Sequence, residues 1–103
     1  MEFYNIISSK LSEKTYQNNI DYLEEFWTVN EIINFIKKTE EVITILKTSP
    51  KTFKKYKNHK SIHQIVILKQ ITLFYEINGK NVALLIFFNN YQDPNKIKKL
   101  LEE

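Results

Sequence analysis

The sequence predicts an α+β domain in which a short N-terminal strand and a helical hairpin precede three antiparallel strands. Two observations carry this prediction. Apolar residues recur every three or four positions between residues 12 and 47, as in amphipathic helices. From Ser61 onward the period changes to two, which is typical of strands with two different faces. We therefore expect a twisted antiparallel sheet with the helices on one face.

Size and composition limit the fold to a single domain over residues 1–103. Hydrophobic residues make up 43% of the chain, enough for one core. Cysteine is absent, which excludes disulfides and thiolate metal sites and fits a reducing cytosol. The N-terminus lacks a signal-peptide pattern. The longest apolar run, Val82 to Phe88, is too short to span a bilayer, so we expect a cytoplasmic protein that does not enter a membrane.

The first expected elements are a strand over residues 2–8 and a helix that opens near Ser12. The run EFYNIIS is rich in aromatic and β-branched residues, as strands are. Ser8, Ser9 and Ser12 offer N-cap side chains. Spacings of four, three and four place an apolar stripe on one helix face, and we expect it in the core: Tyr16, Ile20, Leu23 and Trp27.

A second helix is expected over residues 29–47. Thr28 and Glu31 fit the T-x-x-E pattern of a capping box at its start, and Pro50 marks its end. Because almost no linker separates the helices, they must pack as an antiparallel hairpin. The apolar stripe of this helix comprises Val29, Ile32, Ile33, Ile36, Ile43 and Leu46.

Three strands and a closing helix complete the prediction. The strands are expected over residues 62–69, 71–77 and 82–88, and a short helix over 95–101. Asn78-Gly79 is a strong turn signal and predicts a tight hairpin between the last two strands. The uninterrupted apolar run VALLIFF predicts a central strand covered on both faces, or covered on one face and joined to a partner on the other.

Positive charge is carried by lysine alone, because arginine is absent. Arginine is the usual residue for bidentate phosphate recognition, whereas lysine offers a mobile point charge. The lysine-rich segment, residues 47–60, contains no acidic residue. It is either a solvated loop or a contact for a phosphate backbone or an acidic partner. The contact candidates in this segment are Lys51, Lys54, Lys55, Lys57 and Lys60.

The order and spacing of several stretches resemble the RelE/ParE superfamily of toxins. The N-terminal and helical stretches are FYNIISSK, IDYLEEFW and ILKTSP. The most specific stretch is ITLFYEINGKNVALLIFFNNYQDPNKI, which resembles the two final strands and the closing segment of the family. The resemblance covers nearly the whole chain. Two family arginines are replaced, one by His63 and one by Tyr91, and both changes weaken a cationic clamp.

The resemblance implies a bacterial type II toxin that inhibits growth, serves plasmid stabilisation and is neutralised by a cognate antitoxin in a hetero-oligomer. ParE-like members inhibit DNA gyrase without being nucleases, whereas RelE-like members cut messenger RNA on the ribosome. The weakened clamp favours the ParE-like branch, so we do not expect an enzyme. The alternatives are a RelE-like, metal-independent endoribonuclease and a decayed toxin that only binds antitoxin.

A metal-independent nuclease needs a base, an acid and cations around the phosphate. The candidates for these roles are His63, Lys69 and Tyr91, and Tyr91 is also a candidate contact for the target. The structural interpretation makes His63 a strand residue that hydrogen-bonds or meets solvent, and Tyr91 an aromatic packed over the sheet edge. We expect no cofactor and no metal site, because His59 and His63 lack a third ligand.

Overall fold

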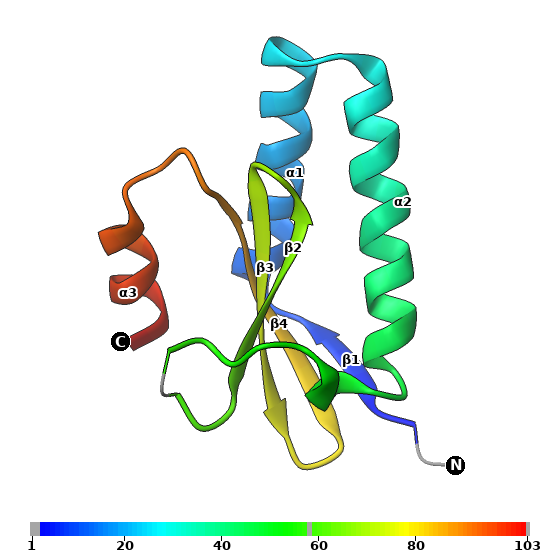
Figure 1. Cartoon of the computed structure of the whole chain (residues 1–103), viewed down its shortest axis with the longest axis vertical. Coiled ribbons are helices and arrows are strands. Elements are labelled where there is room, and N and C mark those ends of the chain that lie inside the picture. The colour runs from blue at the N-terminus through cyan, green and yellow to red at the C-terminus, as the bar shows by residue number, and fades with distance from the viewer. Residues whose placement is uncertain (1–2, 58, 103) are drawn as a thin grey trace.

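Four strands form one sheet in the middle of the molecule, with helices on both sides of it (Figure 1). The computed structural model describes residues 3–57 and 59–102. The elements in chain order are β1 (Asn5–Ser8), α1 (Lys10–Phe26), α2 (Val29–Leu46), the 3-10 turn η1 (Pro50–Thr52), β2 (Ile62–Leu68), β3 (Ile71–Asn78), β4 (Asn81–Asn89) and α3 (Pro94–Glu102). Each expected strand and helix is present. Glu2, at the start of the first expected strand, lies outside the described residues.

The strand order is β1-β4-β3-β2, and β1 runs parallel to β4, which corrects the expectation of a wholly antiparallel sheet. The helical hairpin causes this parallel pairing. α1 leads the chain away from the end of β1, and α2 brings it back to the start of β1. Tyr4 N donates a hydrogen bond to Lys47 O at 2.7 Å, so the residue after α2 lies beside the start of β1. β2 starts at this end, β3 runs back antiparallel to it, and β4 runs antiparallel to β3, so β4 has the direction of β1.

Side-chain caps start both helices of the hairpin. Ser9 Oγ accepts a hydrogen bond from Ser12 N at 3.0 Å, so α1 begins two residues before the expected start. Thr28 Oγ1 accepts a hydrogen bond from Glu31 N at 3.3 Å, as the T-x-x-E pattern predicts. Only Trp27 and Thr28 separate α1 from α2, and Figure 1 shows the two helices side by side. The expected antiparallel hairpin is therefore confirmed.

The sheet face toward the hairpin holds the larger core. Its buried members are Leu23, Phe35, Val42, Leu46, Ile67, Ile71, Leu73, Tyr75, Val82, Leu84 and Phe87. Tyr16 of α1 extends this core, because its ring lies 5.0 Å from the ring of Phe35 and 5.1 Å from that of Phe87. These aromatic contacts join α1, α2 and β4.

The buried stripes of the hairpin are shorter than the sequence predicts, and on α2 the buried face is also rotated: of the expected stripe, Leu46 is buried, Ile32, Ile36 and Ile43 are half-buried, and Ile33 is 44% exposed. Trp27, expected in the core, is 41% exposed, and Val29 is 70% exposed. The buried residues of α2 are Phe35, Thr39, Val42 and Leu46. The reason is the reach of the hairpin, which extends past the sheet in Figure 1, so the residues at its tip have no strand beneath them.

The C-terminal helix α3 lies on the opposite face of the sheet, which corrects the expectation that all helices share one face. The core beneath it is smaller and contains Tyr56, Ile62, Phe74, Ile86, Phe88 and Ile97. As a result, β4 is buried on both faces and paired on both sides. This confirms the central, doubly covered strand that the run Val82 to Phe88 predicts.

The tight turn between β3 and β4 is also confirmed. Asn78 pairs with Asn81, which leaves Gly79 and Lys80 as a two-residue turn. Gly79 has φ +58, the left-handed value that the first central position of a type II′ turn requires. The turn fixes the register of the two longest strands.

Tyr75 ties the sheet to the connector after α2, and this contact predicts a stability change. Its side chain is fully buried, and its hydroxyl donates to Pro50 O at 2.6 Å. We expect Tyr75→Phe to lower the free energy of unfolding by about 1–3 kcal/mol, because the Pro50 carbonyl loses its partner. Urea denaturation measures the loss. Tyr91→Phe changes an exposed phenol and should shift the same quantity by less than about 0.5 kcal/mol. Equal stability of Tyr75→Phe and wild type would contradict this role.

The same phenol predicts a loss of stability at alkaline pH. Burial raises the pKa of Tyr75 above its ordinary value near 10. The unfolded chain therefore releases this proton first, and the free energy of unfolding falls as the pH rises above about 10. Urea titrations at stepped alkaline pH should give a steeper decline for wild type than for Tyr75→Phe. Parallel declines would exclude Tyr75 as the source, since the lysines titrate equally in both proteins.

Candidate functional site

The lysine-rich segment covers the outer edge of β2. Tyr56 N donates to Ile62 O and Gln64 N donates to Lys54 O, both at 2.8 Å. Lys55 forms a β-bridge with His63 between these two bonds. The segment thus satisfies backbone groups that an edge strand leaves open, so it is more than a solvated loop. Its side chains Lys51, Lys54, Lys55, Lys57 and Lys60 are exposed, and Asn58 lies outside the described residues.

Three lysines of the segment line a cavity of about 500 Å³, which we call the lysine cavity. Its lining is Lys51, Lys55, Lys60, Ser61, His63, Ile77 and Gly79. Among the described residues, no acidic side chain belongs to this lining. The cavity gathers positive charge beside an imidazole, and this chemistry suits an anionic group.

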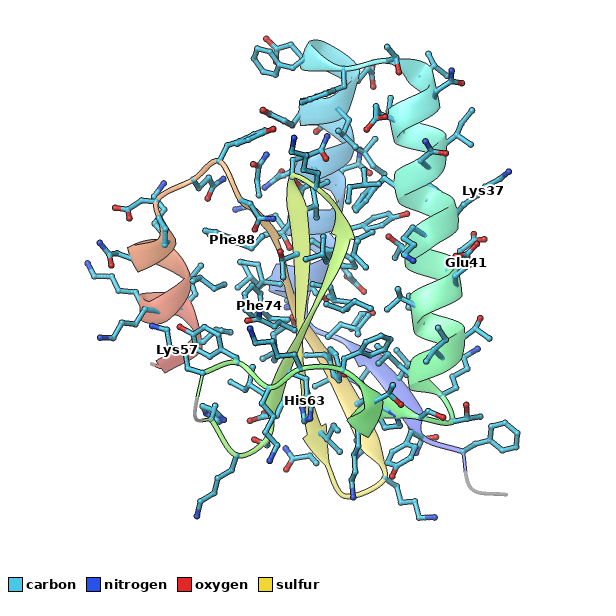
Figure 2. All side chains as sticks on the ribbon, in the orientation of Figure 1. Lys37, Glu41, Lys57, His63, Phe74 and Phe88 are labelled. Carbon is cyan, nitrogen blue, oxygen red and sulfur yellow. The ribbon has the colours of Figure 1, made fainter. Side chains whose placement is uncertain are left out.

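His63 sits at the base of the lysine cavity and serves the fold. Its side chain is 4% exposed, and its ring stacks on Tyr75 with centroids 5.4 Å apart and planes at 16°. Its Nδ1 lies 3.3 Å from Ser61 O. Figure 2 shows His63 at the end of β2 that the connector crosses. These contacts support the structural interpretation of His63, although the ring is buried rather than in open solvent.

The three nuclease candidates do not meet in one place. His63 is at the start of β2, whereas Lys69 lies in the turn that follows β2. The two residues are six positions apart along an extended chain, which corresponds to roughly 20 Å. A general base and its partner groups must reach one substrate within hydrogen-bond distance. The arrangement therefore does not build a site from His63 and Lys69.

Tyr91 lies at the same end of the sheet as Lys69. Asn90 joins the two regions, because its Nδ2 donates to Lys69 O at 3.2 Å and its Oδ1 accepts from Thr72 Oγ1 at 3.0 Å. Tyr91 itself is 60% exposed, so the expectation that it packs over the sheet edge is wrong. It is also far from the lysine-rich segment, which lies at the opposite end of β2. Asp93-Pro94, after Tyr91, correctly marks the end of the sheet, but this sequence signal does not show whether the Tyr91 ring points toward the protein or toward solvent.

The sheet face beneath α3 is apolar. Figure 2 shows Phe74 and Phe88 on the side of the sheet toward α3, where their rings lie 6.5 Å apart. Tyr56 packs edge-on against Phe74 at 5.5 Å. Among the described residues, its hydroxyl is the single buried side-chain polar atom without a hydrogen-bond partner. The sequence analysis placed Tyr56 in an exposed lysine loop and missed this role, because the neighbouring residues Lys54, Lys55 and Lys57 are all exposed lysines.

The described part of the chain holds neither a cluster of metal ligands nor a membrane-spanning helix. Over residues 3–57 and 59–102, no three His, Asp or Glu side chains gather as a metal site would require. Within the same ranges, no helix combines the length and the apolar character needed to cross a bilayer.

Comparisons with known proteins find the same fold in solved toxin structures. One is the chromosomal ParDE toxin-antitoxin system from P. aeruginosa, with a TM-score of 0.68 and 7% identity over 84% of this chain and 96% of that chain. Another is a copper-bound mutant toxin from Helicobacter pylori, with a TM-score of 0.57 and 15% identity over 84% and 93%. A third is the YoeB dimer from Staphylococcus aureus, with a TM-score of 0.57 and 14% identity over 85% and 98%.

Sequence comparisons add nothing to this likeness. No protein-family model matches the chain, and no curated protein matches it in sequence. At identities of 7–15%, the structural likeness shows the fold alone. The chain therefore has the α+β fold of these toxins, which confirms the architecture that the resemblance to the RelE/ParE superfamily implies.

The packing of His63 yields a prediction that separates structure from catalysis. We expect His63→Ala to lower the free energy of unfolding by about 2–4 kcal/mol, because it removes a buried ring from the face of Tyr75. Thermal unfolding followed by circular dichroism measures the loss. Lys69→Ala changes an exposed turn residue and should unfold close to wild type. Unchanged melting of His63→Ala would show that the ring does not support the fold.

Proposed function

We propose that this chain is a ParE-like toxin of a bacterial type II toxin-antitoxin system, acting in the cytoplasm as an inhibitor of DNA gyrase. The fold supports the toxin class. The separation of His63 from Lys69 and Tyr91 supports the ParE-like branch, because inhibition by binding needs no converging acid and base, whereas RNA cleavage does.

A cognate antitoxin is the partner that completes this proposal. β1 is a short edge strand whose Ile7 is half-exposed, so an added strand of another chain can pair with it. Beside it, a cavity of about 250 Å³ lies between the hairpin and β4, lined in part by Tyr16, Ile43 and Leu84. The lysine-rich segment favours an acidic partner. These surfaces support a toxin-antitoxin hetero-oligomer.

The lysine cavity favours a second candidate function. There, Lys55 of the lysine-rich segment and His63 of β2 lie opposite each other in a β-bridge and line one cavity, as a phosphate-binding nuclease would require. This alternative is a RelE-like, ribosome-dependent messenger RNA endoribonuclease that works without a metal. A decayed toxin that retains antitoxin binding alone is the remaining alternative.

Two assays on the purified chain separate these functions. We expect the protein to abolish DNA supercoiling by gyrase and to leave messenger RNA intact in a ribosomal translation reaction. Cut messenger RNA with normal supercoiling would establish the RelE-like alternative instead. Soluble protein without either effect would leave only the decayed toxin.

A paired variant sharpens this test. Tyr91→Phe keeps the ring but removes the hydroxyl that a nuclease would use as an acid, and Lys69→Ala removes a cation at the same end of the sheet. We expect the double variant Lys69→Ala/Tyr91→Phe to inhibit gyrase within twofold of wild type. In a nuclease that used these groups, cleavage would fall by at least about 100-fold.

A further inference from the structure

The end of the α1–α2 hairpin carries large apolar side chains that no other element of the described chain covers. We call this end the tip surface: the apolar residues Phe26, Trp27, Val29 and Ile33 with the acidic residues Asp21, Glu24, Glu25 and Glu31. Phe26 is 63% exposed and Val29 still more so, while Ile33 is nearly half-exposed. Apolar side chains gathered in this way on a soluble protein typically mark an interaction site.

The fold itself does not require these side chains. The hairpin is closed by the Thr28 cap and anchored by Leu23 and Phe35, which are fully buried. Phe26 contacts only the neighbouring ring of Tyr22 among the described ring pairs, with centroids 5.0 Å apart. An exposed side chain contributes little to folding stability. The aromatic and β-branched residues at the tip are therefore available for contact with another molecule.

Charge on the tip surface has one sign. Residues 15–36 contain four acidic residues and no lysine. Asp21, Glu24 and Glu25 line a shallow hollow of about 260 Å³ on the outer side of α1. The lysine-rich segment lies at the other end of the molecule, whose longest dimension is 39 Å (Figure 1). The tip surface thus combines apolar anchors with an acidic border.

This chemistry selects one kind of occupant. Nucleic acid and an acidic antitoxin are repelled by the carboxylates and drawn to the lysine end. Two tips of identical chains would place like charges together, and contact between a tip and the lysine end of another copy would be heterologous, which gives a ring or an open filament rather than the common two-fold dimer. A different folded protein remains, with an apolar cleft bordered by Lys or Arg.

We propose that the tip surface is where the toxin binds the protein it inhibits, with Phe26 and Val29 inserted into an apolar cleft and Glu24 and Glu25 facing its basic border. This rests on the proposed function as an inhibitor of a protein target. Aromatic side chains at the centre of a contact, surrounded by polar residues, are the usual carriers of binding energy in protein interfaces. The lysine-rich segment is then free for the antitoxin.

The test compares two double variants in gyrase supercoiling assays with the holoenzyme. Phe26→Gln/Val29→Gln removes the anchors, and we expect half-inhibition to require at least tenfold more protein. Ile45→Gln/Val66→Gln is the matched control, because it changes two exposed β-branched residues outside the tip, and it should act within twofold of wild type. Circular dichroism should show wild-type melting for both variants, since all four side chains are exposed.

A charge reversal tests the acidic border separately. Glu24→Lys/Glu25→Lys should slow association with gyrase, and the deficit should shrink as salt is added. Glu40→Lys/Glu41→Lys makes the same charge change on α2, where Figure 2 shows Glu41 pointing away from the core, and should have less effect.

The outcomes separate this inference from the proposed function. If wild type inhibits gyrase and the tip variant inhibits it equally well, the tip surface is not the binding site but the gyrase proposal stands. If wild type leaves gyrase active yet arrests bacterial growth, the gyrase proposal fails, and growth arrest becomes the measurement that tests the tip surface. In that case arrest by the tip variant overturns the inference, and loss of arrest upholds it. A wild-type chain inert in both assays overturns both.

Discussion

The burial of β4 on both faces is the constraint that organises this chain. Its side chains alternate between the hairpin and α3, and each apolar residue removed from water stabilises the fold by about 1.5–3 kcal/mol. One face requires the α1–α2 hairpin and the other requires α3, while β1 and β3 satisfy its backbone on either side. The direction of β1 then follows, because the hairpin brings the chain back beside Tyr4 before the remaining strands begin.

Features set by neighbouring residues were predictable from the sequence, and features set by distant contacts were not. Thr28 with Glu31 and the Asn78-Gly79 turn act within a few residues, so their patterns locate them correctly. The side of the sheet that α3 covers depends on the apolar groups left over on β3 and β4. Trp27 shows the same limit, because helical periodicity identifies an apolar face without revealing whether another element covers it.

The candidate site illustrates why residue types alone do not define chemistry. His63 and Lys69 are ordinary choices for a base and a cation, and both lie on or beside β2, yet the length of the strand keeps them apart. Tyr91 lies at the Lys69 end of the sheet because the side chain of the neighbouring Asn90 hydrogen-bonds to the Lys69 carbonyl. No sequence pattern predicts this contact. The burial of Tyr56 could not be predicted for a different reason. The surrounding lysines are typical of a solvated loop, although the backbone of this segment pairs with β2.

The separation of charge along the molecule bears on how its two ends would be recognised. Residues 42–75 contain seven lysines and no acidic residue, whereas residues 15–36 carry only negative charge. At physiological salt, electrostatic interactions fade over about 8 Å, much less than the 39 Å length of the molecule. Each end therefore attracts its own partner with little influence from the other. A partner held at the lysine end would not compete for the tip surface through charge. It would exclude a second partner from the tip only by bulk that extends along the hairpin or by a change in the position of the hairpin.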